Sequence, residues 1–194
     1  MMTNLENGND LIVFSSNPFG SSEVRTSKLM AQFVKRKRVY FFESPIIGVA
    51  KEPTYFLRKN EHEVTVIQPY LPEDLSVFEH KQALLNILKE LIHDENICQY
   101  TIWTDTPKSM PFIRNLNSEI IIYDCLKNYS VTSPELEEEL FQYADLTLTT
   151  GLTEKRKTGR ITKKLSPSFL YLVPCDEDEV IDTSDYSQQQ LYHY

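Results

Sequence analysis

Several polar side chains follow short hydrophobic runs of the sequence, at positions where they could bind a hydroxyl-rich ligand. In chain order they are Asn17, Glu43, Asp105 and Asp124. The carboxylate of Glu43 could accept a hydrogen bond from a sugar hydroxyl or pair with a nearby cation. Asp105 and Asp124 could accept hydrogen bonds from sugar hydroxyls, or one of them could act as a general base. Asp124 could instead cap the turn that follows it.

Three further residues could meet an anionic group such as a phosphate, namely Arg25, Lys127 and Thr150. None of these residues belongs to a tight motif. The sequence holds five glycines and contains no P-loop, no G-x-G-x-x-G, no nucleophile elbow and no metal-ligand spacing. We therefore expect no cofactor and no metal, and the catalytic residues stay unassigned.

The elements that would position these residues alternate between strands and helices. Short runs rich in apolar residues predict seven strands, at 11–14, 39–42, 64–67, 100–103, 119–123, 145–149 and 169–173. Helices are predicted after Ser21 or Ser22, from Ser76, over 107–116, after Ser133 and over 152–157. The basic run at 35–38 is interpreted as the solvated end of the first helix, and 46–60 as an irregular stretch with a short extended piece.

This order predicts an α/β fold, a Rossmann-like, doubly wound and mainly parallel sheet of about seven strands. In such a sheet the loops after the strands meet at the carboxyl edge, where ligands bind. The loop at 15–21, which follows the first strand, is the centre of that edge.

Composition limits the class of protein. The 194 residues predict one domain at 10–175, with a flexible N-terminus at 1–9 and an acidic, Gln- and Tyr-rich flexible tail or truncated interdomain linker at 176–194. A formal net charge of −8 argues against nucleic acid as a partner. Three sparse cysteines and the lack of a signal-peptide pattern predict a cytoplasmic protein with reduced thiols.

Several stretches together resemble a known family. They read D-L-I-V-F-S-S at 10–16, R-T-S-K-L-M at 25–30, V-Y-F-F-E-S-P at 39–45, W-T-D-T-P-K-S-M-P-F at 103–112, I-Y-D-C-L-K-N-Y-S at 122–130, A-D-L-T-L-T-T at 144–150 and L-V-P-C-D at 172–176. Over residues 10 to 176 the chain resembles the N-terminal domain of retaining GT-B glycosyltransferases. It is most similar to a bacterial group associated with or fused to UDP-galactopyranose mutase.

The resemblance implies the acceptor-side domain of a hexosyltransferase-like enzyme of polysaccharide biosynthesis, one half of a GT-B fold. Its partner would be a sugar or glycan acceptor. A nucleotide-sugar would bind only with a second domain, so we expect this chain to be inactive without that donor-binding half. The resemblance also allows peripheral membrane association of the full-length enzyme. The alternative is a standalone, non-catalytic module that binds a sugar or nucleotide or scaffolds a partner.

Overall fold

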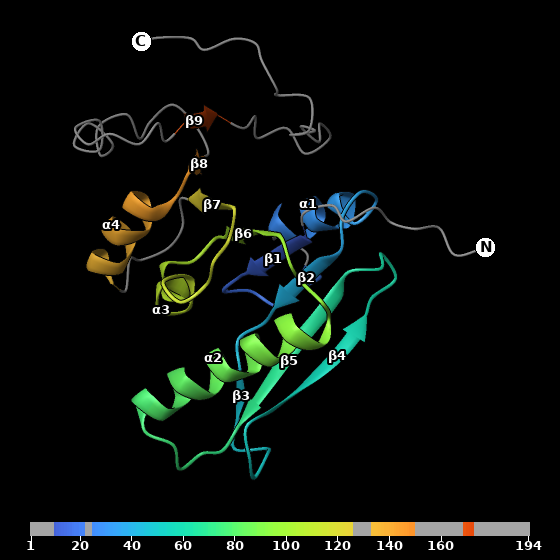
Figure 1. Cartoon of the computed structure of the whole chain (residues 1–194), viewed down its shortest axis with the longest axis vertical. Helices are drawn as coiled ribbons and strands as arrows, with labels where there is room; N and C mark the ends of the chain where they lie inside the picture. Colours follow the sequence, from blue (N-terminus) through green and yellow to red (C-terminus); the bar gives the residue numbers. More distant parts are fainter. Residues whose placement is uncertain (1–9, 22–24, 126–132, 150–168, 173–194) are drawn as a thin grey trace.

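The structure is a computed structural model, and it describes residues 10–21, 25–125, 133–149 and 169–172 (Figure 1). Within these ranges nine strands form one sheet: β1 (Asp10–Phe14), β2 (Val39–Phe42), β3 (Ile46–Ile47), β4 (Thr54–Lys59), β5 (Thr65–Leu71), β6 (Tyr100–Thr104), β7 (Ile120–Cys125), β8 (Leu146–Thr149) and β9 (Phe169–Leu172). The helices are α1 (Arg25–Phe33), α2 (Val77–Asp94), the 3₁₀ turn η1 (Pro107–Ser109), α3 (Met110–Ile113) and α4 (Pro134–Tyr143).

The strand order confirms the predicted doubly wound sheet. Neighbouring strands follow the order β3-β5-β2-β1-β6-β7-β8-β9, with β4 paired to β5. All seven predicted strands are present, and the described strands pair in parallel except for β4 with β5. The chain moves outward from β1 to β2 and β5, then returns to the other side of β1 with β6. The direction therefore reverses between β1 and β6, and this reversal is the switch point of a Rossmann-like sheet.

The stretch predicted as irregular supplies the two additional strands. β3 pairs with the end of β5 in parallel, and β4 pairs antiparallel with residues 65–70 of β5. The predicted short extended piece is thus a six-residue strand at the border of the sheet. Exposed side chains alternate with half-buried ones along most of β4, as expected for a strand with one solvated face.

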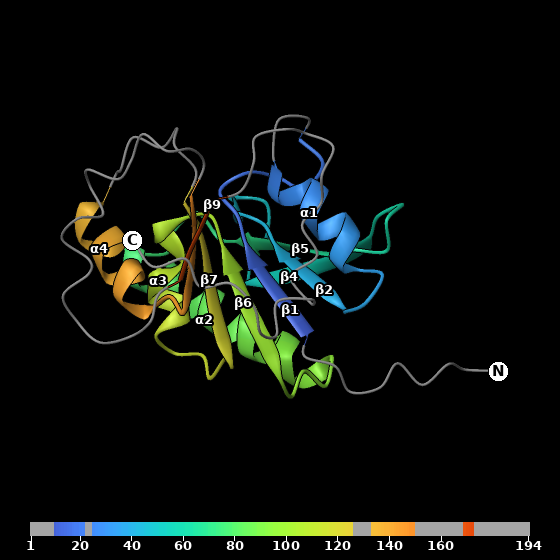
Figure 2. The same cartoon turned by 90° about the horizontal axis from the view of Figure 1, so that it is seen from above.

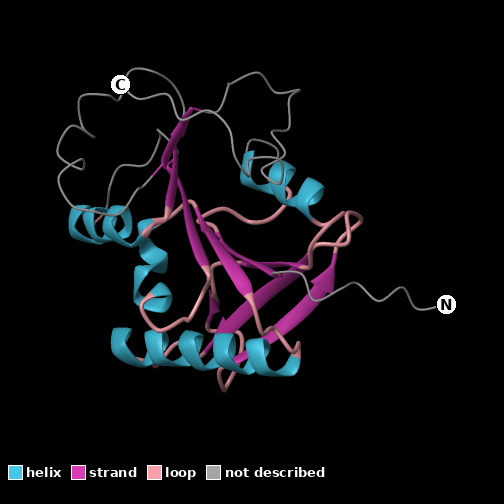
Figure 3. Cartoon of the chain, turned by 45° about the horizontal axis from the view of Figure 1, so that its top comes forward, coloured by secondary structure: helices cyan, strands magenta, loops and turns pink. Residues whose placement is uncertain are grey.

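Helices cover both faces of the sheet (Figures 2 and 3). On one face α1 packs against alternate residues of the central strands, including Val13, Phe41 and Trp103. On the opposite face α2, α3 and α4 pack against the intervening residues, such as Ile12 and Phe14. Every residue of β1 is buried as a result, which explains its continuous apolar run.

Capping side chains form hydrogen bonds at the start of α2 but not at the start of α4. The helix predicted from Ser76 begins with a capping box, in which Glu79 N–H donates to Ser76 Oγ (3.3 Å) and Ser76 N–H donates to the Glu79 carboxylate (2.8 Å). At α4, Pro134 is the first helical residue as predicted, but the Ser133 side chain makes no cap hydrogen bond. Residues 22–24, the predicted helix at 152–157, the N-terminus and the tail lie outside the described residues.

A side-chain clamp joins the amino ends of β1 and β2 to the end of α2. Arg38 Nε donates to Asp10 Oδ1 (2.8 Å), Arg38 Nη1 donates to the carbonyl of Glu95 (2.9 Å), and Tyr40 Oη donates to the Glu95 carboxylate (3.0 Å). Arg38, predicted to lie at the solvated end of the first helix, has a side chain that is 43% exposed and also takes part in this clamp. The parallel pairing of β1 with β2 brings this cation to Asp10, which is distant in sequence.

None of the helices in the described ranges is long and apolar enough to cross a lipid bilayer.

Candidate functional site

Four buried polar residues lie side by side across the carboxyl edge of the sheet. The register pairs Phe42 with Phe14, Phe14 with Thr104, and Thr104 with Tyr123. The residues that follow these four therefore lie at one level on neighbouring strands: Glu43, Ser15, Asp105 and Asp124. We call these four residues the edge row. All four are at least 94% buried.

The edge row lies on the face of the sheet that α1 covers. Side chains two residues apart on a strand point to the same face. Val13, Phe41, Trp103 and Ile122 precede the row by two residues, and all four belong to or pack against the cluster that includes Met30 of α1. The row therefore lies beside the start of α1 and spans the switch point between β1 and β6.

Asp105 fixes the loop that leaves β1. Its carboxylate accepts hydrogen bonds from Ser15 Oγ (2.7 Å), Ser16 N–H (3.0 Å) and Thr26 Oγ1 (3.0 Å). Asp105 is 1% exposed, and burial raises its pKa even though these hydrogen bonds act in the opposite direction. The carboxylate thus joins β6 to both ends of the connection between β1 and α1.

Glu43 fixes the same loop from the other side of β1. Its Oε1 accepts from Phe19 N–H (2.8 Å) and from Arg58 Nη2 of β4 (3.1 Å). Of the two alternatives left open by the sequence, the structure shows pairing with a nearby cation. The Arg58 side chain is 43% exposed, so the ion pair reaches from the buried edge row to solvent.

Asn17 lies in the half-buried part of the loop. Its N–H donates to Ser15 Oγ (3.2 Å), and its Nδ2 donates to Ser16 Oγ (3.4 Å). Gly20 completes the turn with a φ of +85°, a backbone conformation in which glycine is favoured. Its N–H donates to Ser27 Oγ on α1 (3.2 Å).

The remaining predicted residues are placed in part. Asp124 is the next-to-last residue of β7, is fully buried, and is in register with Leu148 of β8. Arg25 is the first residue of α1, close in sequence to the Thr26 contact with Asp105. Lys127 and Thr150 lie outside the described residues.

Sequence reasoning brought Asn17, Glu43 and Asp105 to one edge, but it missed the residues that bind them. Thr26 and Ser27 have a detectable signal, because adjacent hydroxyls follow a turn-rich loop at the start of a helix. Arg58 has no comparable signal, since its contact depends on the antiparallel pairing of β4 with β5.

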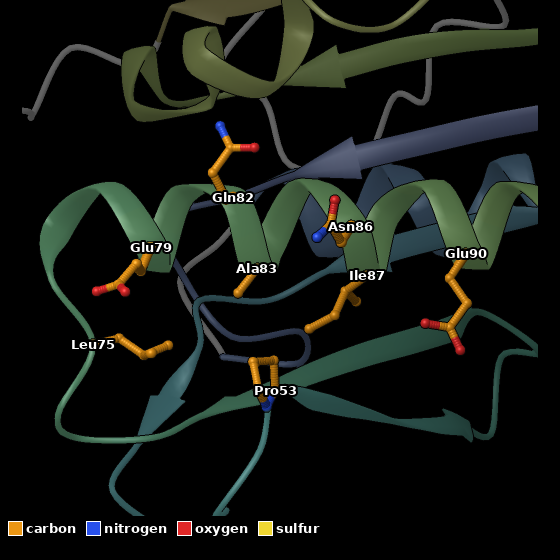
Figure 4. Close-up of a pocket in the computed structure, with 8 residues that line it drawn as sticks. All are labelled: Pro53, Leu75, Glu79, Gln82, Ala83, Asn86, Ile87 and Glu90. Carbon is orange, nitrogen blue, oxygen red and sulfur yellow. The ribbon is translucent and has the colours of Figure 1, made fainter.

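A hollow of about 410 Å³ lies on the opposite face of the sheet, beside α2 (Figure 4). The apolar side chains of Pro53 and Leu75 face Ala83 and Ile87 there. Glu79, which also lines the hollow, is committed to the helix cap. The hollow contains none of the predicted site residues. The described residues also hold no cluster of three or more His, Cys, Asp or Glu that could bind a metal ion.

The fold and the edge row define this chain as a Rossmann-like α/β domain with a mainly parallel sheet. The chain matches no model of a known protein family, and a search of curated proteins found no match.

Proposed function

We propose that this chain is the acceptor-side domain of a GT-B-type glycosyltransferase, and that it binds a sugar or glycan acceptor at the carboxyl edge of the sheet, at the loop that the edge row holds. The observation that carries the proposal is the placement of the row at the β1/β6 switch point, where open α/β sheets bind ligands. Four of the stretches that resemble the family contain a residue of this row, since 10–16, 39–45, 103–112 and 122–130 contain Ser15, Glu43, Asp105 and Asp124.

The contacts of the row favour binding and positioning over proton transfer. Glu43 and Asp105 accept hydrogen bonds from the loop and from α1, so their carboxylates act on the ligand through the loop that they hold. A domain of this kind would orient an acceptor. The donor, and the groups that act on it, would come from a second domain.

The same contacts favour a second candidate, a non-catalytic module that binds a sugar. Neither candidate predicts that this chain alone converts nucleotide-sugars. Incubation with UDP-, GDP- and ADP-sugars should therefore show no transfer or hydrolysis above a heat-killed control. Robust turnover would exclude both. A natural reading frame that continues into a second Rossmann-like domain would favour the transferase over the module.

Amide chemical shifts test the location of the site. Titration with methyl glycosides should shift the amides of residues 16–21 and 105–106 in a saturable way, while shifts confined to α2 would contradict the proposal. Asn17→Ala should weaken binding about threefold to tenfold, the effect of about one hydrogen bond. Asn86→Ala is the matched control, because Asn86 is exposed on α2 on the other face of the sheet.

A further inference from the structure

The backbone N–H groups of the loop between β1 and α1 donate hydrogen bonds to acceptors within the protein. Pro18 has no N–H, and the other five residues of 16–21 all donate within the protein. The acceptors, in chain order, are Asp105 Oδ1 for Ser16, Ser15 Oγ for Asn17, Glu43 Oε1 for Phe19, Ser27 Oγ for Gly20 and the Pro18 carbonyl for Ser21.

This pattern differs from a phosphate-binding loop. Such loops present several backbone N–H groups to the anion. An N–H carries one hydrogen, so a donor used inside the protein is not available to a ligand. A carbonyl or hydroxyl oxygen has two lone pairs and can accept from a ligand in addition to an existing bond. The backbone of the loop therefore keeps the capacity to accept hydrogen bonds, while its capacity to donate them is used.

The charges behind the loop act in the same direction. Two of the five N–H groups donate to the carboxylates of Asp105 and Glu43, which lie on either side of β1. A phosphate at the loop would approach both. Arg58 offsets the charge of Glu43, whereas Asp105 is bound by hydroxyl and amide groups.

We infer that Asp105 and Glu43 close the β1–α1 loop to phosphate and make it selective for an uncharged ligand that donates hydrogen bonds, such as a neutral sugar. The inference rests on the proposed function, because it names the ligand class of the same edge. It also places any phosphate-binding group of the active enzyme away from residues 16–21.

The test compares two probes on the full chain, a neutral methyl glycoside and inorganic phosphate, with the amides of residues 16–21 as the readout. Saturable shifts with the glycoside and none with phosphate are expected. Saturable shifts of these amides with phosphate would overturn the inference and leave the location of the site intact. A loop that responds to neither probe would overturn the proposed function together with the inference.

Two variants of Glu43 test the cause of the selectivity. Glu43→Ala releases the Phe19 N–H, whereas Glu43→Gln removes the same charge but keeps an oxygen that can accept from it. Phosphate should shift the Phe19 amide in Glu43→Ala and leave it unchanged in Glu43→Gln. Equal responses of the two variants would show that the occupied N–H does not exclude phosphate.

Discussion

Replacement of Asp105 by alanine should destabilise the protein strongly. Asp105 accepts three hydrogen bonds from Ser15, Ser16 and Thr26, and alanine would leave these donors without their acceptor. Hydrogen bonds to charged groups contribute about 1.5–3 kcal/mol each. Removal of a buried carboxylate whose pKa is raised by burial offsets part of that loss. We expect the free energy of unfolding to fall by about 3 kcal/mol.

Replacement of Asp105 by asparagine should cost much less, within about 1 kcal/mol. The amide oxygen can accept from Ser16 N–H, and the amide nitrogen can donate to the hydroxyl oxygens of Ser15 and Thr26, since a hydroxyl both donates and accepts. Asp74→Ala, at an exposed aspartate before α2, is the control and should change stability by no more than about 0.5 kcal/mol.

The Asp105→Asn variant should also change the pH dependence of stability. Because the pKa of Asp105 is raised in the folded state, that state holds this proton more tightly than the unfolded chain does. The free energy of unfolding of the wild type therefore falls as pH rises from the pKa that Asp105 has in the unfolded chain through its higher pKa in the folded state. The variant has no such group, so its stability relative to wild type should rise across this window and level off above it.

Urea unfolding at several pH values measures these effects. Trp103 is the single tryptophan, is 2% exposed and lies two residues before Asp105, so its fluorescence reports on this part of the core. Equal losses in the alanine and asparagine variants would refute the hydrogen-bond argument. A stability difference between Asp105→Asn and wild type that does not vary with pH would refute the argument from burial.

Three other substitutions test the remaining contacts and Asp124. Glu43→Ala should speed hydrogen exchange of the Phe19 amide roughly tenfold or more, because it removes the acceptor of a hydrogen bond that contributes about 1.4 kcal/mol. Unchanged exchange would show that Glu43 does not hold the Phe19 N–H. Arg38→Ala should lower the free energy of unfolding by about 1–2 kcal/mol, because it removes a partly exposed charged contact to the buried Asp10. The control Lys35→Ala, at an exposed position just after α1, should have little effect. Asp124→Asn separates the two roles predicted for this buried residue: a role in binding predicts about tenfold weaker binding of a verified glycoside, or about 1.4 kcal/mol, at a nearly constant Tm, whereas a cap predicts unchanged affinity and a stability loss of at most about 1 kcal/mol.

The position of the polar residues in the fold could be predicted from the sequence because it depends on local patterns. Apolar runs such as 11–14 and 39–42 mark strands buried on both faces, and the intervening helix makes the strands parallel. Polar residues that follow parallel strands reach one edge, so Glu43 and Asp105 could be placed there before any contact was known. The capping box at Ser76 and Glu79 is equally local.

The role of those residues was decided by the tertiary structure. Whether a carboxylate at the edge meets a ligand or a loop depends on register and on partners remote in sequence. Asp105 binds Ser15 across 90 residues, and Arg58 reaches Glu43 only because β4 pairs antiparallel with β5. The hydrophobic pattern specifies which face of a strand is buried, but it carries no information about which buried donor faces which acceptor. That pairing is what turns a predicted ligand-binding carboxylate into the support of a loop.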